Sequence, residues 1–240
     1  MDVRDPRARL IVPALGAPGE TLQLSREEAA HARSRRLRPG DPVLLSDGSG
    51  VHAVAEIVRL SRGEAIVRVS EIVVGRSRKT PTPITLYLAG LKPERLAWAV
   101  EKATELDTAR VVVVRSGRTQ SFRASASLVP RLERIARESS KQCGRADWPT
   151  ISGPVDLERV LEEERCAHRL LFDADGNRFP LRLAPLPSAL LVGPEGGWTD
   201  PEKTEASKRG WRIVALPAGT LRAETAAIAA LTLFHSAVER

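Results

Sequence analysis

Two glycine-bearing turns have the residue types and spacing of a ligand site. The first follows the apolar stretch ALLV, which contains Leu191, and its five residues are Gly193, Pro194, Glu195, Gly196 and Gly197. Glycines let the backbone approach a ligand, proline stiffens the turn, and exposed N–H groups can bond acceptor atoms such as those of adenine or a carboxylate. An ordinary strand-to-helix loop has the same composition, so this turn alone leaves both interpretations open.

The second turn lies in the stretch VALPAGTLRAETA, where an apolar run ends near Leu216 and Pro217 and a helix is expected after Leu221. Ligands of open α/β sheets bind beyond the carboxyl ends of the strands, so the two turns are expected on one rim. Arg222 and Glu224 stand at the start of the helix and are candidates for chemistry. Their alternative roles are a surface cation and a carboxylate that offsets the helix dipole.

Other common catalytic patterns are missing from the sequence. Neither the GxGxxG nor the GxxxxGK[ST] pattern occurs, which disfavours the usual dinucleotide and P-loop sites. The four histidines and two cysteines show no metal-ligand spacing, so we expect no metal site.

Two kinds of pattern follow one another along the chain and predict two domains. From Arg9 to Val74 short strands alternate with turns, which favours a small β-barrel with one helical insert that begins at Ser25 and has Glu28 at the capping-box position. After a basic, proline-bearing linker, apolar strands alternate with amphipathic helices, which predicts an α/β sheet. The expected domains are residues 1–75 and 80–240.

The charge suggests a polyanionic partner. The formal net charge is +7 and the sequence pI is about 10.1, so RNA or DNA is the first candidate, although many basic proteins bind no nucleic acid. Two cysteines without a disulfide framework, and no secretory or membrane-spanning segment, lead us to expect a cytoplasmic protein that is not bound to a membrane.

Motifs spread over nearly the whole chain resemble those of the ribosomal RNA small subunit methyltransferase E family, a member of the SPOUT or alpha/beta-knot methyltransferases. Each motif alone is a weak signal, but their combined order and spacing is specific to the family. The motifs are RLIVP, His31 with LRPGD, Asp47-Gly48, QCGR, LLVGPEGGW and LRAETA. The chain departs from the family pattern at Asp107, where glycine is usual, and at Pro217 and Gly219, where glycine and arginine are common.

The resemblance implies an α/β C-terminal SPOUT methyltransferase domain with a trefoil knot, preceded by a PUA-like RNA-binding β-barrel. The implied reaction is methylation of N3 of a uridine in 16S ribosomal RNA, with S-adenosylmethionine as cofactor. The implied partners are the RNA or the small ribosomal subunit and a second copy of the chain in a homodimer.

The resemblance also implies roles for residues. Arg222, with Glu224, would be catalytic, although Glu224, a water or a partner-subunit residue could each be the general base. The cofactor would contact three segments, through Phe172, Leu191, Gly193, Pro194, Glu195, Gly196, Gly197, Leu216, Pro217 and Leu221. RNA would contact arginines of both domains and cations of the linker, namely Arg9, Arg36, Arg38, Arg118, Arg145, Arg76, Arg78 and Lys79.

Two alternatives remain open from the sequence. A sister enzyme of the same superfamily would methylate a ribose 2′-OH, and fold likeness alone does not separate the two activities. A noncatalytic RNA-binding or ribosome assembly factor would have the same fold with a pocket that has lost its cofactor, and the departures at Pro217 and Gly219 are its only support.

Overall fold

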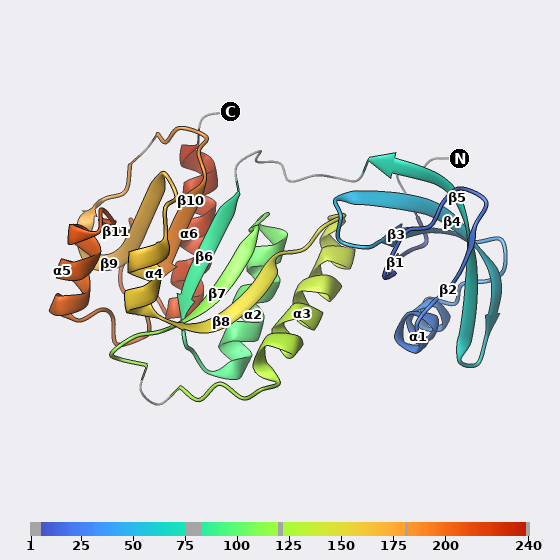
Figure 1. Ribbon diagram of the computed structural model, residues 1–240, viewed down its shortest axis with the longest axis horizontal. Helices are drawn as coiled ribbons and strands as arrows, with labels where there is room; N and C mark the ends of the chain where they lie inside the picture. Colours follow the sequence, from blue (N-terminus) through green and yellow to red (C-terminus); the bar gives the residue numbers. More distant parts are fainter. Residues whose placement is uncertain (1–5, 75–82, 120–121, 181, 239–240) are drawn as a thin grey trace. The chain divides into compact units, whose positions relative to one another are not determined.

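The computed structural model describes residues 6–74, 83–119, 122–180 and 182–238 and divides into two compact units (Figure 1). The N-terminal unit comprises residues 1–79 together with 140–148, and the C-terminal unit comprises residues 80–139 and 149–240. The stretch 140–148 lies, in sequence, well inside the expected second domain. The linker cations Arg76, Arg78 and Lys79 lie outside the described residues.

The N-terminal unit is a five-stranded sheet with one helix. Its strands occur in the order β1-β3-β4-β5-β2, with β1 parallel to β3 and the other neighbours antiparallel. Leu10, Leu45, Ile57 and Val67 form the centre of its core, and the small residues of the helix pack on them. The elements are β1 (Ala8–Ile11), β2 (Thr21–Gln23), α1 (Arg26–Ser34), β3 (Pro42–Ser46), β4 (Val51–Ser61) and β5 (Glu64–Val74).

Helix α1 begins with only one half of the expected capping box. Ser25 accepts a hydrogen bond from the backbone N–H of Glu28, as predicted. The Glu28 carboxylate instead pairs with Lys141, whose Nζ lies 2.9 Å from its Oε1, and the two side chains are 6% and 8% exposed. This buried ion pair attaches the stretch 140–148 to α1, and it explains why that stretch belongs to the N-terminal unit.

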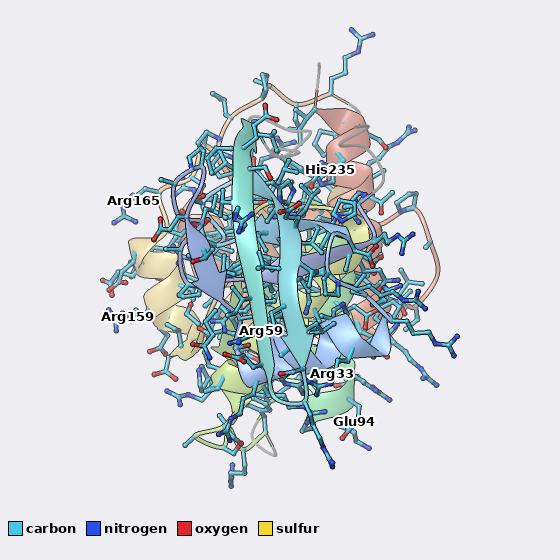
Figure 2. All side chains as sticks on the ribbon, turned by 90° about the vertical axis from the view of Figure 1, so that its right-hand side faces the viewer. Arg33, Arg59, Glu94, Arg159, Arg165 and His235 are labelled. Carbon is cyan, nitrogen blue, oxygen red and sulfur yellow. The ribbon has the colours of Figure 1, made fainter. Side chains whose placement is uncertain are left out.

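The β4–β5 hairpin ends in an exposed group of charges. Arg59 of β4 pairs with Glu64 at 2.7 Å, and the Arg33 side chain of α1 donates to the carbonyl oxygen of Ser61 at 2.8 Å. Figure 2 labels both arginines, which lie at the same end of this unit. These contacts are solvent-exposed, so each contributes little to stability.

The C-terminal unit is a six-stranded, all-parallel sheet in the order β11-β9-β10-β6-β7-β8 (Figure 1). The α/β class predicted from the sequence is confirmed, and the knot stays a prediction. Its strands are β6 (Ile84–Ala89), β7 (Arg110–Arg115), β8 (Thr150–Asp156), β9 (His168–Arg178), β10 (Ser188–Val192) and β11 (Arg212–Ala215). Its helices are α2 (Pro93–Glu105), α3 (Leu128–Cys143), α4 (Leu157–Glu163), α5 (Asp200–Lys208) and α6 (Ala223–Ala237).

The central strands β6 and β10 are buried along their whole length because helices cover both faces of the sheet. Tyr87, Leu171 and Leu191 pack with α4 and α5 on one face. Successive strand residues point to opposite faces, so Leu86 and Leu190 face the side on which α2 and α6 pack together. No helix within the described ranges is long and apolar enough to cross a membrane.

Strand β8 and helix α4 were missed by the sequence analysis. Gly153 and Pro154 interrupt the apolar pattern of β8. The strand tolerates a proline because it lies at the edge of the sheet. Helix α4 has only seven residues, too few for a helical period to be recognised.

The departure at Asp107 coincides with an unusual backbone conformation. Asp107 follows the end of α2 with φ of 56°, in the left-handed region that glycine adopts most readily. Aspartate is one of the few other residues that adopt this conformation at modest cost. The substitution therefore keeps the turn after α2.

We expect the substitution Lys141→Met to lower the free energy of unfolding by about 3–5 kcal/mol, because it leaves the buried Glu28 carboxylate without its cation. Chemical denaturation measures the change. The double variant Lys141→Met, Glu28→Leu should recover most of the loss, and Arg59→Ala, at an exposed ion pair, should cost less than about 1 kcal/mol. A Lys141→Met protein as stable as the Arg59→Ala protein would contradict this prediction.

Candidate functional site

A cavity of about 460 Å³ lies beyond the carboxyl ends of β10 and β11 and beside the middle of β9. Three chain segments and the single residue Arg118 line it, and the segments include the predicted residues Phe172, Gly193, Pro194, Glu195, Gly196, Gly197, Leu216 and Leu221. The predicted rim of strand-end turns is therefore present. We refer to this space as the acidic cavity, for the charges described below.

Two of the residues expected in this cavity do not line it. Leu191 is fully buried within β10 and packs into the core beside α4 and α5, so it supports the turn from below. Pro217 is exposed in the loop after β11, while its neighbours Leu216 and Ala218 line the cavity.

Trp198 joins two of the three segments. Its buried indole Nε1 donates a hydrogen bond to the carbonyl oxygen of Phe172 at 3.0 Å. The same ring covers Gly193 so closely that a Cβ at that position would lie 2.9 Å from Trp198 Cε2. Gly193 is thus required for the close approach of the turn to the indole.

The helix after the turn is fixed by a complete capping box. Thr199 and Glu202 each accept a hydrogen bond from the other's backbone N–H. The second Glu202 oxygen accepts from the backbone N–H of Gly117 at 2.8 Å. The start of α5 is therefore connected to the loop that follows β7.

Two arginines, one from a helix and one from a loop, hold the Gly193–Gly197 turn. Arg95, in the first turn of α2, forms an ion pair with Glu195 and has its Nε 3.6 Å from Glu224 Oε1. Arg118, after β7, donates to the carbonyl oxygen of Gly196 and lines the cavity. The sequence analysis missed Arg95, and it expected Arg118 at the RNA.

The middle of β9 adds carboxylates that the sequence analysis did not single out. Asp173 and Asp175 line the cavity together with Glu195 and Asp200, against two cations, Arg118 and Lys203. Lys203 lies 3.3 Å from Asp200 and 3.9 Å from Asp173, and its hydrogen bond to Asp200 raises the pKa of Lys203. The charged lining is therefore predominantly acidic. The letters DAD directly after an apolar run were the available signal.

The two predicted catalytic residues occupy different environments. Arg222 is exposed at the N-cap of α6, between the lining residues Leu221 and Ala223. Glu224 is 8% exposed, and its Oε2 is buried without a hydrogen-bond partner. Arg95 links Glu224 to Glu195, so Glu224 acts on the cavity wall through another residue.

The arginines expected to contact RNA in the N-terminal unit divide by exposure. Arg36 and Arg38 are exposed beyond the end of α1, and Arg9 is half-buried with its Nη1 3.5 Å from the Lys141 carbonyl oxygen. Arg145 is 3% exposed and donates to Asp147 at 2.9 Å. Its guanidinium is thus engaged in a buried ion pair, and its contact with RNA stays a prediction.

No three His, Cys, Asp or Glu side chains of the described residues are grouped to hold a metal ion. The predominantly acidic lining of the cavity favours a ligand that carries positive charge. Its size is typical of small-molecule and cofactor pockets.

Two family matches cover most of the chain. Residues 78–235 match the RNA methyltransferase domain, and residues 24–70 match the RNA methyltransferase PUA domain. The PUA match lies within the five-stranded N-terminal unit, and the methyltransferase match contains every segment that lines the acidic cavity.

Two similar proteins have the same name. Ribosomal RNA small subunit methyltransferase E of Mycobacterium bovis is 30% identical over 234 residues, which cover 92% of this chain and 88% of that protein. The Synechocystis protein of the same name is 28% identical over 215 residues, with coverage of 86% and 70%.

Solved structures of methyltransferases also resemble this chain. A methyltransferase from Legionella pneumophila, in complex with the bound cofactor SAM, has a TM-score of 0.89 at 28% identity and covers 96% of this chain and 98% of its own. The Neisseria gonorrhoeae ribosomal RNA small subunit methyltransferase E shares the fold, with a TM-score of 0.87 at 24% identity and coverage of 95% and 97%. With the domain matches and the identity over nearly its full length, this chain belongs to the ribosomal RNA small subunit methyltransferase E family.

Proposed function

We propose that this protein transfers a methyl group from S-adenosylmethionine to N3 of a uridine in 16S ribosomal RNA. The observation that carries the proposal is the acidic cavity, formed by three chain segments in a member of this enzyme family. An RNA substrate of the ribosome also implies that the enzyme works in the cytoplasm.

The lining of the acidic cavity fits S-adenosylmethionine. Carboxylates of Asp173 and Asp175 suit the positive charges of the sulfonium and the ammonium group. Val192, Leu216 and Leu221 offer apolar surface for the adenine ring, and the glycine turn offers backbone groups for its polar edge. This fit supports the catalytic reading over a noncatalytic RNA-binding factor.

The chemistry requires a deprotonated base nitrogen near the cofactor. When bound, S-adenosylmethionine would supply a methyl group on a positively charged sulfur: uracil N3 would form the N–C bond as the S–C bond breaks, S-adenosylhomocysteine would leave, and the N3 proton would pass to a water molecule. Because N3 loses its proton, negative charge spreads onto the two flanking carbonyl oxygens. The Arg222 guanidinium, beside the cavity lining, stabilises that charge through charge-assisted hydrogen bonds.

Glu224 has a positioning role in this proposal. Its ion pair with Arg95 connects the first turn of α6 to the Glu195 side chain, and therefore to the wall of the cavity. Because most of the rate enhancement in methyl transfer comes from orientation of the two reactants, a fixed wall matters as much as any proton acceptor.

RNA and a second copy of the chain complete the proposed assembly. Arg36 and Arg38 contact RNA phosphates, since both are exposed in a PUA-like unit. Homodimerisation is supported by the family likeness and by Trp98 of α2, a large apolar side chain that is 42% exposed in the single chain.

Mapping of the modified nucleotide tests the reaction directly. We expect purified enzyme with isotope-labelled S-adenosylmethionine to methylate unmethylated small ribosomal subunits at one uridine, on the base. Nuclease digestion and mass spectrometry locate the label. Label on a ribose would support the 2′-O-methyltransferase alternative, and no incorporation despite cofactor binding would contradict the proposed substrate.

Two glycines of the acidic cavity provide a matched test of the cofactor site. Gly193→Ala should weaken S-adenosylmethionine binding at least tenfold, because its Cβ would meet the Trp198 ring at 2.9 Å and displace the turn. Gly219→Ala should bind normally, since a Cβ there has no atom within 4 Å. Isothermal titration calorimetry measures both affinities. Equal affinities for the two variants would exclude the turn as a cofactor contact.

Substitution of Arg222 separates catalysis from cofactor binding. Arg222→Ala should lower kcat by about 100-fold, because one preformed donor to the developing charge is lost, while the affinity for S-adenosylmethionine stays unchanged. Arg212→Ala, at an exposed arginine where β11 begins, is the control and should keep full turnover. Full turnover by Arg222→Ala would rule out the assigned role.

A further inference from the structure

A second cavity, of about 330 Å³, lies at the same edge of the sheet. Its lining comes from the segments that follow β6, β7 and β10, whereas the acidic cavity lies over β9, β10 and β11. The residues that matter for its chemistry are Gly90, Lys92, Arg118, Phe122, Arg123 and Glu195.

The two cavities share a wall. Arg118, Pro194 and Glu195 line both of them. This wall is held from two sides, since Arg118 donates to the carbonyl oxygen of Gly196 and Arg95 pairs with Glu195. Ligands in the two cavities would therefore lie next to each other.

The cavities differ in the sign of their charge. The second cavity has three cations, Lys92, Arg118 and Arg123, and one carboxylate, Glu195, which Arg95 partly neutralises. The acidic cavity has four carboxylates and two cations. We refer to the second space as the basic cavity, because it favours an anion where its neighbour favours a cation.

An aromatic ring stands in the wall of the basic cavity. Phe122 is half-buried and lies directly on Gly90, where a Cβ would come within 2.5 Å of the ring. Its backbone N–H donates to the carbonyl oxygen of Thr119 at 2.9 Å, so main chain and side chain are both anchored. A fixed aromatic face beside cations is the combination on which nucleic acid bases stack while phosphates are neutralised.

We propose that the basic cavity binds the acceptor nucleotide of the RNA, with its base against Phe122 and its phosphate on Lys92 and Arg123. Lys92 is the exposed N-cap of α2, where the helix dipole also favours an anion. The proposal rests on the methyltransferase function above and adds the place of the substrate. Because the two cavities share lining residues, the base would lie next to the methyl donor, as direct transfer to N3 requires.

A binding experiment with uridine 5′-monophosphate tests the cavity without turnover. Saturation-transfer NMR measures the Kd of the nucleotide and the Kd of uridine. Both are measured on the wild-type protein in the presence of saturating S-adenosylhomocysteine. Phe122→Leu should raise the Kd of the nucleotide about tenfold, and Phe122→Tyr, which keeps an aromatic face, should restore it. Lys92→Ala should abolish the preference for the nucleotide over uridine, while Lys208→Ala, at an exposed lysine where α5 ends, should not.

The same variants are then assayed with unmethylated small ribosomal subunits. Phe122→Leu should raise KM for the subunit severalfold and leave the calorimetric Kd of S-adenosylmethionine within a factor of two. Nucleotide binding that S-adenosylmethionine displaces, or an unchanged subunit KM in Phe122→Leu and Lys92→Ala, would overturn the assignment of the cavity. Failure of the wild type to bind S-adenosylmethionine would instead contradict the proposed function. Nucleotide binding tests the basic cavity independently of that result.

Discussion

The geometry of the site depends on the buried indole of Trp198. Its N–H donates to the carbonyl oxygen of Phe172 in the middle of β9, and its ring lies on Gly193, directly after β10. A buried hydrogen bond of this kind is costly to break, because the freed carbonyl would have no water to replace the donor. The strand and the glycine turn are thus held together, and the cavity between them has a defined shape.

Around that contact, charged groups from other loops divide the sheet edge into two environments. Arg95 and Arg118 bind the Gly193–Gly197 turn from the side of β6 and β7, and the carboxylates of Asp173 and Asp175 gather on the side of β9. An acidic pocket beside a basic one repels the RNA backbone from the first and attracts it to the second. Such a pattern sorts a cationic cofactor from an anionic substrate by electrostatics alone.

The N-terminal unit shows a different constraint, in which residues far apart in sequence complete one core. Glu28 and Lys141 are 113 residues apart and form a buried ion pair. Removal of either partner alone destabilises the fold, because it leaves the other charge buried and unpaired. The unit that resembles a PUA domain therefore includes the stretch 140–148 as well as residues 1–79, and Arg145 is used inside it.

The sequence by itself determined the α/β class of the second domain, the helix that begins after Ser25, the helix after Leu221 and the two glycine turns, because periodicity, caps and turn residues act between near neighbours in the chain. Only the tertiary structure decided which turns meet. The strand order β11-β9-β10-β6-β7-β8 differs from the chain order, so Arg95 and Arg118 reach the Gly193–Gly197 turn from segments about 100 and 80 residues earlier, without any local signal. The pairing of Glu28 with Lys141, and hence the composition of the first unit, depends likewise on contacts that sequence spacing does not encode.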